Sequence, residues 1–144
     1  MGNFVNDISF GQKYEKIARD LCTEEVTEIA VGRVKEYDFK TVKYSYEVKA
    51  DRWEHKYQNK SFFIEYECSG KPSGISSTKA DYWFYFMVHP SGQFQVYRLP
   101  VDVLKQECKT KMRSVCGGDG GRSRGHIVSI NNLLSYRIKT ADDL

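Results

Sequence analysis

The segment Tyr82–Val88 constrains the fold of this chain more than any other part of its sequence. It reads Tyr-Trp-Phe-Tyr-Phe-Met-Val, so both of its faces are apolar. A strand that borders solvent alternates apolar and polar residues, whereas a strand covered on both faces is apolar throughout. This segment is therefore predicted to be the central strand of a sheet that carries a further layer on each face.

The flanking segments predict an α/β domain. Tyr14, Ile17, Ala18 and Leu21 recur at the spacing of one helix face, and Ser9 with Gln12 forms a capping-box pattern, which predicts a helix over residues 10–22. Strands are expected at residues 28–34, 44–51, 61–68, 80–89, 93–99 and 126–130. A helical turn capped by Ser77 or Thr78 is expected before residue 80, and a second helix over residues 100–109, beginning at Pro100. At 144 residues, the chain is expected to form one domain, 1–144, with a central mixed sheet flanked by helices.

The charge of the chain permits nucleic-acid binding without requiring it. The net charge is +3 and the isoelectric point about 8.6. Positive residues concentrate near the C-terminal third, at Lys105, Lys109, Lys111, Arg113, Arg122 and Arg124. Glycines among them predict a mobile loop over residues 117–125. Two interpretations stay open for this basic loop: contact with a phosphate backbone, or an ordinary solvated surface.

No leader sequence or membrane-spanning run is apparent, so the chain is expected in the cytoplasm with its four cysteines reduced. Cys108 and Cys116 together with histidines offer an alternative zinc site, although their spacing fits no standard zinc module.

Residues 37–49 contain the most specific chemical pattern. They predict two short strands joined by a tight turn, with Asp38 on the first strand and Glu47 and Lys49 on the second. Because side chains alternate along a strand, Glu47 and Lys49 share a face, and the hairpin returns Asp38 beside them. Two carboxylates and an ammonium group suit a hard cation and an attacking water.

This pattern resembles the PD-(D/E)XK nuclease superfamily, in which an acidic residue is followed, after a gap, by Glu/Asp-x-Lys on the next strand. Asp38 and Glu47-Val48-Lys49 carry the resemblance, although Tyr37 stands in place of the proline. Glu15 matches a helical acidic residue that is common near the start of such domains. The segments 62–67, 70–75 and 80–83 also resemble small phage and bacterial members.

The resemblance implies a restriction-endonuclease-like core and a Mg²⁺-dependent DNA endonuclease, in which Mn²⁺ substitutes for Mg²⁺. Asp38, Glu47, Glu15 and the Val48 carbonyl would bind the metal, one ion or two, and Lys49 would position the attacking water. Contacts with DNA are expected from Lys71, Ser73, Ser77, Thr78, Arg122 and Arg124. Branched or junction DNA is the expected substrate, with RNA left open. By analogy the enzyme would be a homodimer, in the host cytoplasm if it is phage-encoded. The alternative is a catalytically inactive nuclease-fold protein that binds a partner in phage–host conflict.

Overall fold

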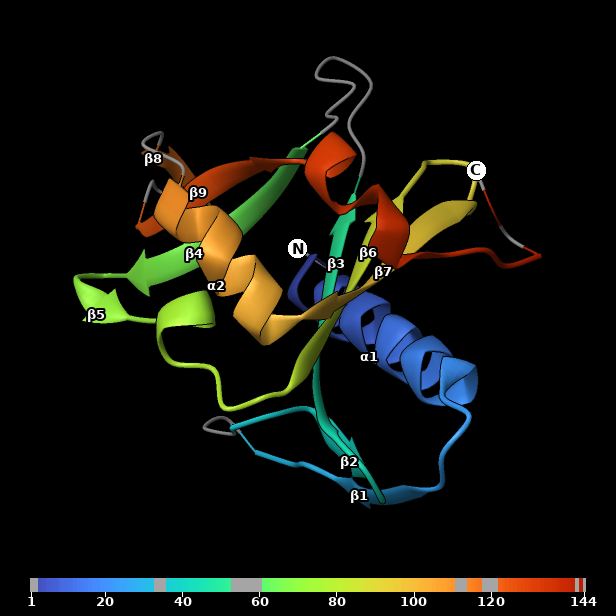
Figure 1. Ribbon diagram of the computed structural model, residues 1–144. Helices are drawn as coiled ribbons and strands as arrows, with labels where there is room; N and C mark the ends of the chain where they lie inside the picture. The colour runs from blue at the N-terminus through green and yellow to red at the C-terminus, as the bar shows by residue number, and fades with distance from the viewer. Residues whose placement is uncertain are drawn as a thin grey trace.

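The computed structural model describes residues 3–32, 36–52, 61–110, 114–117, 122–141 and 143 (Figure 1). Its elements are α1 (Asn3–Leu21), β1 (Val26–Ile29), β2 (Phe39–Thr41), β3 (Ser45–Arg52), β4 (Ser61–Cys68), β5 (Lys71–Pro72), the 3-10 turn η1 (Gly74–Ser76), β6 (Tyr82–Val88), β7 (Phe94–Pro100), α2 (Val101–Thr110), β8 (Ser114–Gly117), β9 (Ser123–Ser129), the 3-10 segment η3 (Ile130–Tyr136) and β10 (Arg137–Ile138).

The larger sheet is mixed and has the strand order β1-β2-β3-β6-β7-β10. Its strands pair antiparallel, except that β3 and β6 run parallel. β6 lies inside this sheet, and every residue from Trp83 to Val88 is buried. This position and burial confirm the sequence prediction of a central strand in a mixed sheet. A strand covered on both faces has no side toward solvent, so it is apolar throughout.

A second sheet has the order β5-β4-β9-β8 and was not anticipated as a separate unit. Figure 1 shows it together with α2 on one side of the molecule, while β1 and β2 extend away at the bottom. The strand predicted at 61–68 is β4, but it pairs with β9 rather than with a strand of the larger sheet.

Two hydrophobic cores result, one on each face of the larger sheet. On one face, Tyr14 and Ala18 of α1 pack with Phe84 and Phe86 of β6. On the other face lies a cluster from β6, β7, β4 and α2, whose members include Trp83, Tyr85, Leu99, Phe62, Ile64 and Leu104. The alternation of β6 residues between the two clusters fixes which face each strand residue of the candidate site occupies.

Two predictions at the N-terminal end need correction. α1 begins at Asn3, so Ser9 lies inside the helix and is not its cap. A capping box is a local preference and does not prevent a helix from starting earlier in the chain. Within α1 the Phe10 ring packs against Tyr14, and the Arg52 guanidinium lies 4.0 Å from the Phe10 ring centroid. The first strand is Val26–Ile29 rather than 28–34, because Gly32 adopts a φ of +102°, which an extended strand excludes.

Two predictions in the loops were also wrong. The helical turn precedes Ser77 instead of following it, because Gly74 takes a φ of +51° and starts η1. Residues 123–125 of the predicted mobile loop belong to β9, and Gly117 belongs to β8, because these two strands pair directly. Residues 118–121, and Lys111 and Arg113 of the basic group, lie outside the described residues.

None of the helices in the described part of the chain is long and apolar enough to cross a membrane.

Candidate active site

The turn between β2 and β3 is formed by Thr41. Its hydroxyl accepts hydrogen bonds from the backbone N–H groups of Lys43 (3.2 Å) and Tyr44 (3.1 Å), and its own N–H donates to the Tyr44 carbonyl (2.8 Å). Hydroxyl side chains that accept from nearby backbone N–H groups stabilise such turns. β2 then pairs with β3 from Lys40 to Phe39, and the predicted hairpin is confirmed.

Asp38 is fixed where this pairing ends. Its side chain is buried, and one carboxylate oxygen accepts a hydrogen bond from the Val48 N–H at 2.7 Å. Its backbone N–H donates to the Tyr46 carbonyl (2.8 Å), and its carbonyl accepts from the Ala30 N–H (2.9 Å). The Asp38 carboxylate therefore lies against the edge of β3, at the residue between Glu47 and Lys49.

Glu47 and Lys49 form an ion pair on one face of β3. The Lys49 ammonium lies 3.5 Å from a Glu47 carboxylate oxygen and 5.6 Å from the centroid of the Trp83 ring. The Glu47 side chain is 19% exposed and that of Lys49 is 39% exposed. An ammonium held by a carboxylate and an aromatic face keeps its charge at a defined place while solvent still reaches it.

The Val48 backbone faces Asp38. In an extended strand, the N–H and C=O of one residue point to the same side. Because the Val48 N–H donates to Asp38, the Val48 carbonyl is directed to the same edge of β3. This orientation agrees with the ligand role predicted for that carbonyl.

Glu15 comes from the opposite side of the larger sheet. α1 packs on the face that carries Tyr46 and Val48, whereas Glu47 and Lys49 project from the other face. Among the described residues, no group of three histidine, cysteine, aspartate or glutamate side chains is close enough to hold a metal ion. The expected set of three carboxylates, and the alternative zinc site, are therefore not assembled there, and the metal role of Glu15 stays a prediction.

A pocket of about 290 Å³ lies beside Lys49, between the two sheets. Asp51, Glu65, Trp83, Tyr85 and other residues line it. Tyr85 is buried, and its hydroxyl donates to the Asp51 carboxylate. Burial raises the pKa of Asp51, and the hydrogen bond from Tyr85 opposes that shift.

Sequence reasoning missed Glu65 and Tyr85 as neighbours of Lys49. Glu65 lies on β4, which belongs to the second sheet, and no local signal predicts how two sheets pack. Tyr85 lies beside Lys49 because β3 pairs in parallel with β6, in a register that aligns these two residues.

The residues expected to contact DNA separate into two groups. Lys71, Arg122 and Arg124 lie at one end of the second sheet, where Lys71 pairs with Cys68 and Arg124 forms an ion pair with Glu67 at 3.5 Å.

The hydroxyl residues surround η1. Ser73 and Ser77 flank it, and the Thr78 hydroxyl accepts from the Trp83 indole N–H at 3.2 Å. Thr78 therefore anchors a core side chain, and the DNA contacts of both groups stay predictions.

Comparison of the sequence with protein-family models and with curated proteins gives no match.

Proposed function

We propose that the chain is a metal-dependent endonuclease whose site is built on the β2–β3 hairpin, in a restriction-endonuclease-like arrangement. The observation that carries this proposal is the Asp38 carboxylate held at 2.7 Å from the Val48 nitrogen, between Glu47 and Lys49. It brings the acid that precedes β2 to the centre of the Glu-x-Lys segment of β3. The mixed sheet, with the hairpin on one side of the parallel β3–β6 pair and α1 over one face, supports the arrangement.

The donor set fits Mg²⁺. This ion is usually bound by one or two carboxylates, completed by waters and substrate phosphates. Asp38, which directly precedes β2, and Glu47 of β3 supply carboxylates, and the Val48 carbonyl is a third oxygen. When bound, the metal would neutralise phosphoryl charge and lower the pKa of a water molecule.

The remaining roles belong to side chains of the chain itself. Lys49, held by Glu47, donates hydrogen bonds to the attacking water and to a phosphoryl oxygen, where negative charge develops. Asp38 is kept in place by its backbone hydrogen bonds, so its carboxylate does not need to reorganise during the reaction.

A cleavage assay tests this function. Supercoiled, single-stranded, flapped and four-way DNA, with RNA in parallel, are incubated with Mg²⁺ or Mn²⁺ and with wild type, Lys49→Ala, Glu47→Gln or Lys43→Ala. Lys43 is an exposed lysine in the turn of the same hairpin and is the matched control. Lys49→Ala is expected to lower the cleavage rate about 100-fold or more, whereas Lys43→Ala retains it. Equal rates for wild type and Lys49→Ala would overturn the enzyme proposal.

The second candidate is a nuclease-fold protein that binds nucleic acid or a host protein without catalysis. Thermal unfolding separates the candidates, because a ligand that binds only the folded state raises the melting temperature. If the site binds metal, Mn²⁺ should raise the melting temperature of wild type and leave the melting temperature of Glu47→Gln unchanged. The homodimer, the cytoplasmic location and the preferred substrate stay predictions.

A further inference from the structure

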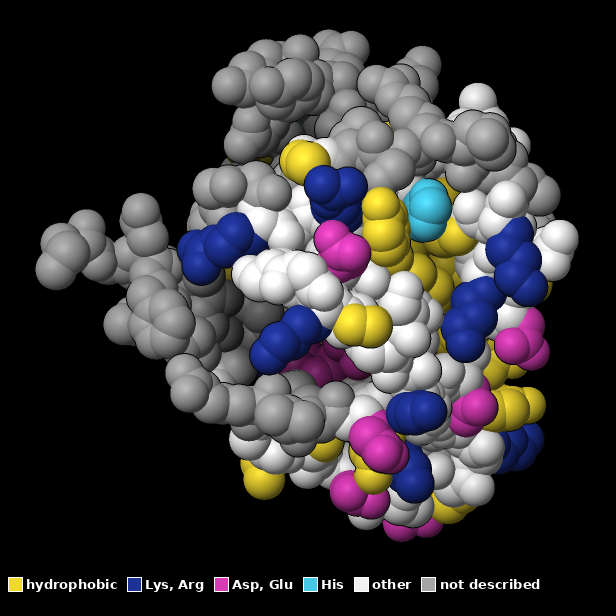
Figure 2. Space-filling model, turned by 90° about the vertical axis from the view of Figure 1, so that its left-hand side faces the viewer, with side chains coloured by type: hydrophobic (Ala, Val, Ile, Leu, Met, Phe, Trp, Pro, Cys, Tyr) yellow, Lys and Arg dark blue, Asp and Glu magenta, His cyan; other side chains and the backbone are white. Residues whose placement is uncertain are grey.

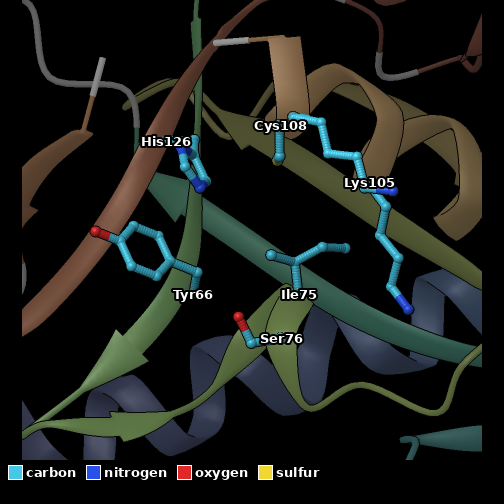
Figure 3. Close-up of a pocket in the computed structure, with 7 residues that line it drawn as sticks. Tyr66, Ile75, Ser76, Lys105, Cys108 and His126 are labelled. Carbon is cyan, nitrogen blue, oxygen red and sulfur yellow. The ribbon is translucent and has the colours of Figure 1, made fainter. Parts of the chain in front are cut away.

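A second pocket, of about 570 Å³, lies between α2, η1 and the second sheet. Figure 3 shows Tyr66 from β4, His126 from β9, Ile75 and Ser76 from η1, and Lys105 and Cys108 from α2 around one space. Lys109 completes the lining. Figure 2 views the molecule from this side and shows hydrophobic side chains gathered in a hollow beside a histidine. The volume lies in the range of small-molecule sites, about 300–1,000 Å³.

One wall of this pocket is aromatic. The rings of Tyr66 and His126 lie with their centroids 4.6 Å apart and their planes tilted by 30°. Within the described part of the chain, the buried Nδ1 of His126 has no hydrogen-bond partner. Because this nitrogen is out of reach of solvent, it offers no hydrogen bond to a ligand, and the wall contributes ring surface.

The opposite wall is cationic. Lys105 and Lys109 are four residues apart on α2, so they emerge on the same face of the helix, and both are exposed. No acidic side chain is among the described residues that line the pocket. The cationic lining therefore favours an anionic ligand.

The floor of the pocket is apolar and holds no reactive group among the described residues. Ile75 and Cys108 are buried there, and the Ser76 hydroxyl lies at the rim. Burial, with Glu107 nearby, raises the pKa of the Cys108 thiol to about 11. The thiol is therefore neutral at physiological pH and contributes apolar surface rather than a nucleophile.

We propose that this pocket binds a nucleotide, with the base against Tyr66 and His126 and the phosphate at Lys105 and Lys109. An aromatic wall facing a pair of lysines matches a ligand that is planar at one end and anionic at the other. The nucleotide is either a free mononucleotide or one residue of a single strand. This pocket shares no lining residue with the Lys49 pocket: Tyr66 of β4 lines this one, whereas Glu65 lines the other. The proposal does not depend on the nuclease function.

Calorimetric titration of the full-length chain in EDTA tests the proposal without hydrolysis. The probes are AMP, adenosine, inorganic phosphate and a short single-stranded deoxyadenylate. Lys105→Ala/Lys109→Ala should weaken binding about tenfold or more, and Tyr66→Leu about fivefold or more. The control Lys13→Ala/Lys16→Ala removes two lysines from α1, on the far face of the larger sheet, and should bind as wild type does. Binding of AMP identifies a free nucleotide, and binding of the deoxyadenylate alone identifies a strand.

Several outcomes would overturn the proposal. One is inorganic phosphate binding as tightly as AMP, because the aromatic wall would then contribute nothing. Another is equal weakening by the two double-lysine variants, which would indicate general attraction to a basic protein. The titrations in EDTA need no catalysis, and the cleavage assay does not involve Lys105 or Lys109, so failure of the nuclease proposal and failure of this one give different results. Circular dichroism verifies that each variant is folded.

Discussion

Replacing Asp38 with alanine should destabilise the protein even before any metal or substrate is considered. Asp38 is 6% exposed, and its carboxylate accepts the Val48 N–H at 2.7 Å. The alanine variant leaves that N–H without its acceptor beside β3. Leaving a buried donor unpaired costs about 1–3 kcal/mol, and hydrogen bonds to charged groups contribute about 1.5–3 kcal/mol. We therefore expect the free energy of unfolding to fall by about 2 kcal/mol, which lowers the melting temperature by about 6 °C.

Asparagine at the same position separates the hydrogen bond from the charge. Its amide oxygen can accept the Val48 N–H, so Asp38→Asn should regain most of the stability that alanine loses. It should also lose the metal-induced rise in melting temperature, because the charged ligand is gone. Thermal and urea unfolding in EDTA, followed by circular dichroism, measures the first effect, and the same scans with Mn²⁺ measure the second.

A surface aspartate provides the control for Asp38. The Asp20 side chain is 69% exposed. Among the described contacts, its carboxylate pairs only with the Lys16 ammonium, which lies one turn earlier on α1 at 3.4 Å. Asp20→Ala should change stability by about 0.5 kcal/mol or less. If Asp38→Ala is as stable as Asp20→Ala, the hydrogen bond to Val48 does not stabilise the hairpin. If Asp38→Asn loses as much as alanine, the charge rather than the hydrogen bond is responsible.

Two further substitutions test the surroundings of the site. Burial raises the pKa of Asp51 in the folded state. The contribution of Asp51 to stability is therefore present at acid pH and lost as the pH rises through that pKa. The hydrogen bond from the Tyr85 hydroxyl opposes this loss, because it stabilises the ionised carboxylate. Tyr85→Phe should therefore lower the free energy of unfolding by about 1–2 kcal/mol at neutral pH and by less at about pH 4; equal losses in urea titrations at both values would contradict this. Gly74→Ala should lower the free energy of unfolding by about 2 kcal/mol or more, because the added Cβ would lie 2.2 Å from the Glu65 carbonyl oxygen. The control is Gly92→Ala, where φ is +93° and the added Cβ would meet nothing within 4 Å. It should lower the free energy of unfolding by about 1 kcal/mol. Equal melting temperatures for these two variants would show that the contact with Glu65 adds no cost at position 74.

Local patterns in the sequence were sufficient for several elements of the fold. The apolar run of β6, the hairpin at Asp38–Lys49 and the helix that follows Pro100 all lie within a residue or two of their predicted bounds. Each depends on interactions between residues close in the chain: strand alternation, a hydroxyl-stabilised turn, and a proline at a helix start. For the same reason, the sequence placed Glu47 and Lys49 on one face of their strand.

The sequence alone determined that this chain contains a doubly covered central strand and an Asp38–Glu47–Lys49 hairpin. Only the tertiary structure decided that β3 runs parallel to β6, that β4 and β9 form a separate sheet, and that Glu15 approaches from the opposite face. The same long-range packing brings Tyr66 and Lys105 to one pocket. These features depend on contacts between segments far apart in the chain, and neither periodicity nor capping signals carry information about such contacts.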